Sequence, residues 1–483
     1  MNNIKRELKN GIFFTAIGKY VSYISNFIVQ IFLSRILTPS DWGVAAAVLV
    51  IVPFFLLLSE SGAGPAIIQN DFLSDFDLSS IFKILAAISF FASIIFGLCG
   101  WPISRFYNNK AFISLMWAFA PTLLFSILQV VPMAILNKKE EFKQVNLTNA
   151  IAFIVGGIIG VIAGFAGARY FALAFTNAIP ALVNFLLMYR LSGFHMKKGF
   201  SLNSFKKILS FSVYQLSFQI VNYFPRNLDN LLAEKFLGKA PTGQYNKSYQ
   251  LLTYPSQLFT AIVTPVLQPV LARRFGDVKI VKKAYLTVMR ILFILGIPLS
   301  AYLSLNAKQI ILVIFGNQWG PAVLPFQMLA LTIWVQLVIA TTGPIFQARN
   351  LTKLLFNLGL ITAIITVGFI ILGVSLGSIV YLAVGVTIGY LINFFITYFY
   401  LMRKALKGTL FELLKEMRKP IVSTVLPTIL DLIFLQYFSY SSSIFWKNFF
   451  ILVLSSLIFL ICWLISAYLD KDFKFLINLF KRS

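Results

Sequence analysis

Two stripes of polar residues on otherwise apolar helical stretches are the positions of this sequence best suited to bind a polar or charged ligand. The first lies within 11–37 and the second within 208–233, and both keep the spacing of one helix face. A charged side chain at the bilayer centre costs at least about 2.5–3.5 kcal/mol, so such a face must meet protein or water. We therefore expect the stripes to line a shared cavity. Their members are Thr15, Lys19, Ser22, Asn26 and Gln30, and Gln215, Gln219, Asn222, Arg226 and Asn230.

Lys19 and Glu60 are the charged residues expected deep in the first two helices. Each lies eight residues from the inner end of its helix, which corresponds to a depth of about 12 Å at about 1.5 Å per residue. The two side chains can therefore pair if the helices face each other. One interpretation is a basic substrate anchor whose charge Glu60 tunes, and the other is a neutralised pair that only fixes helix packing.

Arg226 follows Pro225 and precedes Asp229 by three residues. Proline removes a backbone hydrogen bond, so this helix is expected to bend there. The planar guanidinium, with its five donors, suits a phosphate group. The sequence thus predicts that Arg226 meets an anionic substrate and that Asp229 moderates its charge. The alternative is an internal Arg226–Asp229 pair buried in the bundle.

Other chemistry-bearing residues favour structural roles. Cys99 and Cys462 lie in separate spans without metal-ligand spacing, and no nucleophile–base set is found, so we expect neither an enzyme, a cofactor nor a metal site. Asp431 is expected to serve packing, with a proton site as the alternative. The acidic run at 71–77 is expected to be a solvated helix entry. The glycines within 156–160 suit close helix packing, because a phosphate loop would need a strand and a Lys-Ser/Thr.

The elements that carry these residues are membrane helices. Hydrophobic residues make up 59% of the 483 positions and charged residues only 12%, a composition that a soluble protein cannot bury. Apolar runs of about 18–27 residues predict an all-α polytopic membrane protein of about fourteen spans. They lie near 11–37, 44–68, 79–101, 111–136, 146–167, 169–190, 208–233, 245–270, 283–306, 321–348, 354–374, 379–402, 420–438 and 444–468.

The distribution of basic residues predicts the orientation of these spans. With both termini cytoplasmic, the inner segments hold 30 of the 41 Lys and Arg residues and the outer segments hold nine, while Lys19 and Arg226 lie within spans. This asymmetry is the positive-inside pattern. The net charge of +25 is thus spread over short loops beside anionic headgroups, which argues against a nucleic-acid partner.

An offset of two hundred positions indicates an internal duplication. The stripes share it, and so do the segments that follow them, in which residues 33–37 and Gly43 correspond to 233–237 and Gly243. Because six spans separate the copies, the repeats are parallel. The predicted domains are an N-terminal six-helix lobe, a cytoplasmic linker, a C-terminal six-helix lobe, an amphipathic segment on the inner leaflet, and two extra helices with a basic tail. Their respective bounds are 1–190, 191–207, 208–402, 403–419 and 420–483.

Three segments resemble the bacterial polysaccharide transporter family. They are Ser34-Arg35-Ile36-Leu37-Thr38-Pro39-Ser40-Asp41-Trp42-Gly43, then Asn227-Leu228-Asp229-Asn230-Leu231-Leu232, and finally 236–251, which includes Gly243-Gln244-Tyr245-Asn246-Lys247. The family contains the Wzx-type flippases and belongs to the superfamily of MurJ and the MATE drug exporters. The resemblance implies a two-lobed, fourteen-helix transporter in the cytoplasmic membrane of a bacterium.

The implied activity is the movement of undecaprenyl-diphosphate-linked oligosaccharides to the outer leaflet by alternating access, for cell-surface polysaccharide synthesis. Basic residues typically line the family's cavities, and here Lys19, Arg226 and, at the outer edge, Lys247 match that role. Asn26, Gln219 and Asn222 would bind sugar, and Glu60 or Asp229 would tune charge or couple an ion. The implied partners are the lipid-linked substrate and membrane lipids, with a polymerase and glycosyltransferases as candidates, and a monomer contains a complete pathway. The alternatives are a MATE-like drug exporter, which would favour acidic cavity groups, and a polysaccharide polymerase or ligase, which would need a large outer loop.

Overall fold

The computed structural model describes the backbone of residues 2–60, 63–204, 223, 227–272, 278–349, 351–438 and 445–470. Within these ranges, the side chains of 2–17, 58–60 and 259–272 are outside the description. All regular structure in the described residues is helical. The chain divides into two compact units, Met1–Gly243 and Gln244–Ser483.

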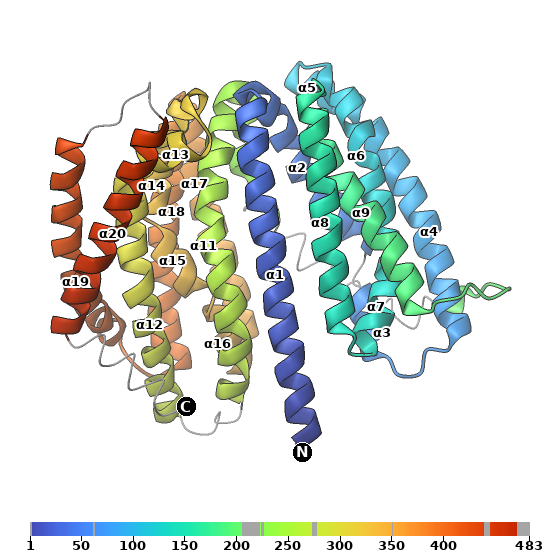
Figure 1. Ribbon diagram of the computed structural model, residues 1–483. Helices are drawn as coiled ribbons and strands as arrows, with labels where there is room; N and C mark the ends of the chain where they lie inside the picture. Colours follow the sequence, from blue (N-terminus) through green and yellow to red (C-terminus); the bar gives the residue numbers. More distant parts are fainter. Residues whose placement is uncertain are drawn as a thin grey trace. The chain divides into compact units, whose positions relative to one another are not determined.

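The described part of the first unit contains nine helices and a further helical stretch over 227–236. The long helices α8 and α9 lie side by side, with α1 on the other side of α8 and α6 on the other side of α9 (Figure 1). The helices are α1 (Asn2–Ile36), α2 (Pro39–Glu60), α3 (Ala63–Gln69), α4 (Asp75–Leu98), α5 (Gly100–Tyr107), α6 (Ala111–Leu128), α7 (Val130–Lys138), α8 (Phe142–Phe165) and α9 (Phe171–Ser192).

Glycines on α8 allow its neighbours to approach closely. A Cβ added to Gly156 would overlap the ring of Pro180 on α9, and one added to Gly160 would overlap the side chain of Thr176. On the other side of α8, a Cβ on Gly157 would overlap Val29 of α1. The packing role expected for this glycine run is therefore confirmed, because small residues let membrane helices pack backbone to backbone.

The second unit has the same order of long helices and adds a C-terminal pair. In the second unit α17 packs against α18, as α8 packs against α9 in the first unit. Both α12 and α18 pack on the α14–α15 segment, which corresponds to the packing of α4 and α9 on α6. The elements are α11 (Lys239–Ala272, which begins in the first unit), α12 (Val278–Leu305), α13 (Ala307–Ile314), η1 (Asn317–Ala322), α14 (Val323–Ala330), α15 (Ile333–Ile339), α16 (Thr342–Ala348), α17 (Thr352–Ser375), α18 (Ile379–Tyr400), η2 (Leu401–Ala405), α19 (Leu410–Tyr437) and α20 (Phe445–Leu469).

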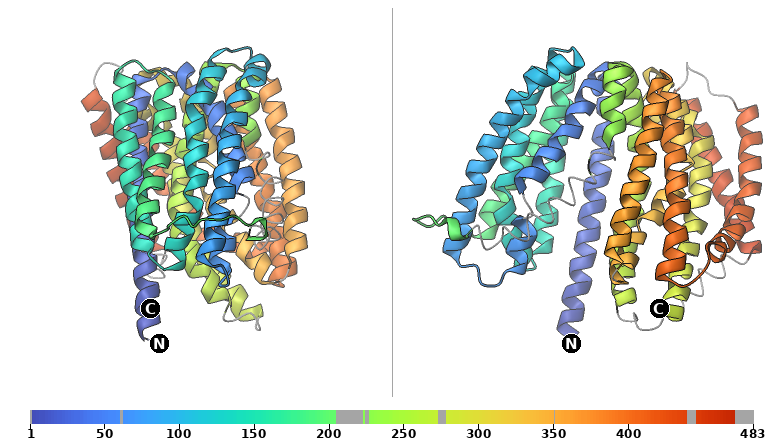
Figure 2. Two further views of the ribbon diagram at one scale, coloured as in Figure 1. Left: turned by 90° about the vertical axis from the view of Figure 1, so that its right-hand side faces the viewer. Right: turned by 180° about the vertical axis from the view of Figure 1, so that it is seen from behind.

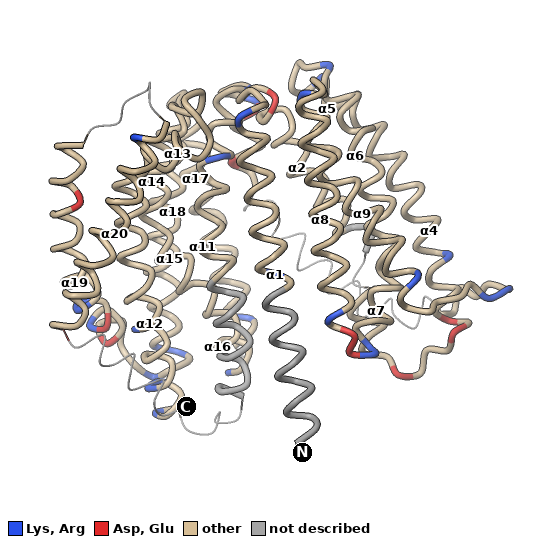
Figure 3. Tube along the Cα trace, viewed as in Figure 1, with Lys and Arg blue, Asp and Glu red and all other residues tan. Residues whose placement is uncertain are grey.

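Ten of the fourteen predicted spans, or eleven if the bent stretch 317–348 is one span, are found among the described residues. Ten are single stretches long and apolar enough to cross a membrane, and the eleventh, 317–348, bends by 48° near Leu331. The other three predicted spans fall on α1, on 208–233 and on α11, whose side chains are partly or largely outside the described residues. Lys, Arg, Asp and Glu lie mostly near the ends of the helices (Figure 3), and the protein is a multi-pass membrane protein.

The linker after α9 is anchored to the start of α4, as both views in Figure 2 show. Lys83 Nζ donates to the carbonyl oxygens of Lys197 at 2.6 Å and Gly199 at 2.7 Å. Asp77 closes a capping box with Ser74 and accepts a hydrogen bond from Ser204 at 2.7 Å. The acidic run is therefore a helix entry, as expected, although Asp77 is buried rather than solvated.

The segment 403–419 differs from the expected helix on the inner leaflet. From Leu410 onward it is the start of α19, which continues without a break through Pro420. Leu406 and Leu413 are fully buried and join Tyr285 and Tyr398 in the core of the second unit. Glu412 forms an ion pair with Lys282 of α12 at 2.8 Å, and this hydrogen-bonded pair lowers the pKa of Glu412. The apolar face therefore packs against protein, because α12 lies alongside it.

Candidate functional site

The first polar stripe occupies a distinct side of α1. Lys19 is exposed, and so are the apolar side chains of Ile24, Ile28 and Phe32. Lys19 and Ile28 are nine positions apart, which at about 100° per residue places them on opposite sides of the helix. The helix therefore presents one apolar side suited to lipid and one side with an ammonium group, which requires water or polar partners.

Close packing against α8 fixes the rotation of α1. A Cβ on Gly18 would overlap Asn146 of α8, and Leu33 and Ile36 lie against Gly164 at the other end of the contact. Because the contact extends from Gly18 to Ile36, α1 cannot turn about its axis without a clash. Lys19, which is next to Gly18, is thus held at the border of the packed face.

Ser22, Asn26 and Gln30 of the stripe on α1 are partly buried, and the side chain of Thr15 lies outside the described residues. Ser22 Oγ donates to the carbonyl oxygen of Gly18 at 2.9 Å, which satisfies this hydroxyl within the helix. Asn26 and Gln30 are half-buried, and Ser34 Oγ donates to the carbonyl oxygen of Gln30 at 2.5 Å. Lys19, Asn26 and Gln30 are therefore the stripe positions with a charged or amide group placed on this side of α1.

Four of the predicted site side chains lie outside the described residues: Glu60, Gln219, Asn222 and Arg226. The expected pairs Lys19–Glu60 and Arg226–Asp229 stay predictions for that reason. Asp229 itself is 2% exposed, and its Oδ1 accepts hydrogen bonds from the backbone N–H of Asn230 at 2.8 Å and from Asn230 Nδ2 at 3.3 Å.

Lys247 is buried within the second unit. Its side chain is 0% exposed, and Nζ lies 5.0 Å from the ring centre of Phe315 and 5.7 Å from that of Trp319. Nζ also donates to Gln250 Oε1 at 3.2 Å. Aromatic faces attract a cation more strongly when water is excluded. In this conformation Lys247 thus joins α11 to the α13–η1 turn.

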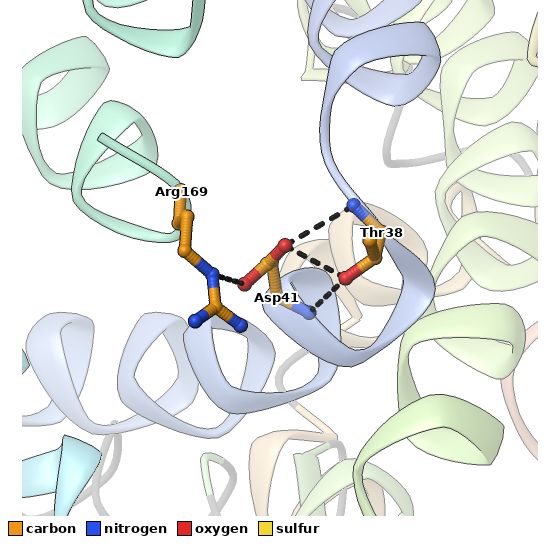
Figure 4. A network of polar contacts seen from close by, with 3 residues as sticks. All are labelled: Thr38, Asp41 and Arg169. Carbon is orange, nitrogen blue, oxygen red and sulfur yellow. Dashed lines mark hydrogen bonds and ion pairs between the residues drawn. The ribbon is translucent and has the colours of Figure 1, made fainter. Parts of the chain in front are cut away.

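A polar network holds the turn that begins α2. Thr38 and Asp41 cap the helix reciprocally, with Thr38 Oγ1 donating to Asp41 Oδ2 at 2.7 Å and the Asp41 backbone N–H donating to Thr38 Oγ1 at 3.2 Å. Arg169, from the α8–α9 loop, donates through Nε to Asp41 Oδ1 at 3.1 Å (Figure 4). Asp41 is 4% exposed at its side chain, so the network fixes α2 against the α8–α9 loop.

The equivalent turn of the second repeat has matching backbone hydrogen bonds, although Gly238 has a positive φ of 90° and Thr38 does not. The hydrogen bonds from Leu37 N to Leu33 O and from Leu237 N to Ala233 O are both 2.8 Å long. Those that start the next helices, from Trp42 to Thr38 and from Thr242 to Gly238, are 3.2 and 3.1 Å. These matched bonds support the duplication at an offset of two hundred positions.

The two turns contact each other reciprocally through glycines. A Cβ on Gly43 would overlap the carbonyl oxygen of Lys239, and a Cβ on Gly243 would overlap the carbonyl oxygen of Pro39. At the offset of the repeat, Pro39 corresponds to Lys239 and Gly43 to Gly243. The contact is therefore reciprocal at the offset of the predicted duplication, and a Cβ on either glycine would overlap a backbone carbonyl oxygen.

Glu234 is a buried carboxyl just past the predicted span 208–233. It is 5% exposed, and its Oε2 has no hydrogen-bond partner among the described residues. Burial raises the pKa of Glu234 to about 7, against the lowering effects of the charge on Lys239 and a hydrogen bond from Thr242. A glutamate in an unfolded chain has a pKa of about 4.3. Between that pH and about pH 7, the folded protein therefore keeps a proton on Glu234 that the unfolded chain has lost.

We expect Glu234 to make the stability depend on pH. The free energy of unfolding is highest, as far as Glu234 is concerned, below about pH 4, where the residue is protonated in both states. It falls by on the order of 3 kcal/mol as pH rises through about 7. Glu234→Gln should raise the melting temperature of purified protein at pH 8 and have little effect at pH 4. The exposed Glu140 supplies the control Glu140→Gln, and equal pH profiles for wild type and Glu234→Gln would exclude this role.

Comparisons with known proteins agree with this fold. A family model described as "Polysaccharide biosynthesis protein" matches residues 32–324. The chain is 22% identical to the lipopolysaccharide biosynthesis protein WzxC of Escherichia coli (strain K12), over 79% of this chain and 78% of WzxC. It is also 22% identical to the teichuronic acid biosynthesis protein TuaB of Bacillus subtilis (strain 168), over 74% of each chain.

Solved structures of the same fold are transporters. The lipid II flippase MurJ superposes with a TM-score of 0.75 at 16% identity, over 95% of this chain and 99% of MurJ. A MATE multidrug transporter of the MOP superfamily superposes with a TM-score of 0.62 at 16% identity, over 80% of this chain and 95% of the transporter. The family model covers more than half of the sequence, so the chain belongs to the polysaccharide biosynthesis protein family that it describes.

Proposed function

We propose that this protein is a flippase that moves undecaprenyl-diphosphate-linked oligosaccharide units from the inner to the outer leaflet of a bacterial cytoplasmic membrane. The observation that carries the proposal is the position of Lys19, an exposed ammonium on the side of α1 opposite Ile28. The names of WzxC and TuaB support a polysaccharide precursor as cargo, and the fold shared with MurJ suits a lipid-linked one.

The diphosphate is the part of such a substrate that a basic residue recognises. Hydrogen bonds to charged groups contribute about 1.5–3 kcal/mol each, so Lys19 and Arg226 are assigned to the diphosphate. Asn26, Gln219 and Asn222 are assigned to sugar hydroxyls, while the polyprenyl tail stays in lipid. Lys247 is assigned to the outer edge of the path, and to reach cargo there it must leave Phe315 and Trp319.

Glu60 and Asp229 are assigned to tuning the charge of the basic residues or to coupling an ion. Movement of a negative charge outward across an inside-negative membrane is favourable by about 2.3 kcal/mol per 100 mV. The membrane potential alone can therefore drive part of the transfer of a diphosphate. Collapsing the potential and the proton gradient separately distinguishes this drive from proton coupling.

The proposed mechanism is alternating access between the lobes 1–190 and 208–402. Parallel repeats related by an axis along the membrane normal can rock against each other and open a central path to one side at a time. Both termini are assigned to the cytoplasm from the excess of basic residues in the inner segments. A single chain supplies both lobes, and a polymerase and glycosyltransferases are the proposed neighbours in the cell.

Depletion of the protein from its native cell tests the proposal. After depletion, a membrane-impermeant reagent is added to intact cells to label lipid-linked oligosaccharide in the outer leaflet. We expect the precursor to accumulate unlabelled on the inner leaflet. Normal labelling after depletion, in a strain without a second family member, would contradict the proposal. Increased drug sensitivity with normal labelling would instead indicate an exporter of the MATE kind.

A further inference from the structure

Asp431 is a fully buried carboxyl in the C-terminal helix pair. It lies on α19, which packs against both α12 and α20, and it is 0% exposed. An ionised carboxylate in such a place would be costly without a basic partner. No ion pair in the described part of the chain includes Asp431.

Three side chains form a closed ring of hydrogen bonds at this position. Asn306 Nδ2 lies 2.6 Å from Asp431 Oδ2, and Ser455 Oγ lies 2.6 Å from Asp431 Oδ1. Ser455 Oγ also lies 2.8 Å from Asn306 Oδ1, which closes the ring. The three residues come from the junction of α12 and α13, from α19 and from α20, so the ring joins the C-terminal pair to the rest of the second unit.

The ring has fewer hydrogens than hydrogen bonds unless Asp431 is protonated. Three hydrogen bonds need three hydrogens, of which the Asn306 amide supplies the one to Asp431 Oδ2. The Ser455 hydroxyl carries a single hydrogen, yet Ser455 Oγ contacts two acceptor oxygens, Asp431 Oδ1 and Asn306 Oδ1. If that hydrogen goes to Asn306, the bond between Asp431 and Ser455 needs a hydrogen on Asp431.

The neighbouring hydroxyl groups do not supply the missing hydrogen. Ser456 Oγ donates to the carbonyl oxygen of Leu452 at 2.7 Å, so the 2.5 Å contact between Tyr302 and Ser456 uses the hydrogen of Tyr302. The Tyr302 hydroxyl also interacts with Ser455 and with Asp431, but it carries no second hydrogen for the ring. The other titratable or charged groups in the packed elements are distant from the ring or turned outward. Lys308 of α13 and Lys447 of α20 are exposed, and Cys462 lies about two turns further along α20 than Ser455.

We propose that Asp431 is a proton-binding site, and that the bound proton completes the ring by which α19 and α20 dock on α12. With the proton, Asp431 donates to Ser455, Ser455 donates to Asn306, and Asn306 donates to Asp431. Loss of the proton removes one bond of the ring and leaves a charge without a basic partner. The docking of the C-terminal pair therefore weakens as pH rises. This proposal stands independently of the cargo.

The variants Asp431→Asn and Asp431→Leu test the site in the Glu234→Gln background, which removes the other proposed pH-dependent carboxyl. An asparagine amide can donate to Ser455 and accept from Asn306 without titrating, whereas leucine can do neither. We expect the melting temperature of the parent to fall as pH rises from 5 to 9. Asp431→Asn should keep the melting temperature that the parent has at pH 5 and show a flat profile, and Asp431→Leu should melt lower at every pH.

Infrared spectroscopy of the parent provides a direct readout. The carbonyl stretch of a protonated carboxyl should be present at pH 6 and missing from Asp431→Asn. Absence of a band that depends on Asp431 would overturn the proposal, and so would a fold loss in Asp431→Asn as large as in Asp431→Leu. A melting temperature that rises with sodium concentration in the parent but not in Asp431→Asn would indicate a cation site and equally overturn it.

Discussion

Lys19→Ala is expected to lower the flipping rate about 10- to 100-fold at normal protein level. Removal of the ammonium deletes a charged hydrogen bond to the diphosphate, which contributes about 1.5–3 kcal/mol, and each 1.4 kcal/mol corresponds to about a factor of ten. Folding should be little affected, because Lys19 is exposed and the α1–α8 contact is made by Gly18, Val29 and Leu33. The rate is measured by leaflet-specific labelling of the precursor in cells that express the variant alone.

Two further variants control this experiment. Lys19→Arg keeps a positive charge and should retain most of the activity, while Lys110→Ala removes an exposed lysine from the α5–α6 connection and should have no effect. If Lys19→Ala flips at the wild-type rate, the polar side of α1 has only a structural role. In that case the ammonium serves the Lys19–Glu60 pair or the membrane interface.

Gly43→Ala and Gly243→Ala are each expected to destabilise the protein by about 1–3 kcal/mol or more. The added methyl group would overlap a backbone carbonyl oxygen, of Lys239 in one case and of Pro39 in the other. A backbone group cannot rotate away as a side chain can, so the turns must separate. Because the contact is reciprocal, the two variants should lose similar amounts of thermal stability and of membrane abundance.

The matched control is Gly359→Ala on α17. No atom lies within 4 Å of the Cβ position of Gly359, and alanine is favoured over glycine in a helix by about 1 kcal/mol. This variant should melt at or above the wild-type temperature. Wild-type stability in both Gly43→Ala and Gly243→Ala would show that the two turns do not approach as closely as the geometry requires.

The sequence predicts the repeating and local features of this fold well. Hydropathy locates spans such as 146–167 and 169–190 because each is a continuous apolar helix, α8 and α9. The glycines within 156–160 predict close packing because a missing side chain has the same consequence wherever the partner helix comes from. The offset of two hundred positions pairs the turns at 33–43 and 233–243, whose backbone hydrogen bonds match although Gly238 has a positive φ and Thr38 does not.

The polar contacts between distant elements could not be predicted in the same way. Asp41 pairs with Arg169 from a loop 128 positions away, and Asp431 meets Asn306 at a separation of 125. Helical periodicity specifies which face a residue occupies but leaves open which helix that face meets. Lys247 illustrates this, because its sequence position suggested an outer-edge ligand, whereas the aromatic rings that surround it come from Phe315 and Trp319.

The most direct test of the flippase assignment uses purified protein in liposomes that contain a fluorescent undecaprenyl-diphosphate oligosaccharide. An impermeant quencher added outside reports how much of the lipid reaches the outer leaflet over time. We expect complete quenching with wild-type protein, about half with empty liposomes, and a rate at least about tenfold lower with Lys19→Ala. Quenching that stays at about half with folded wild-type protein, under an imposed potential as well as without one, would contradict it.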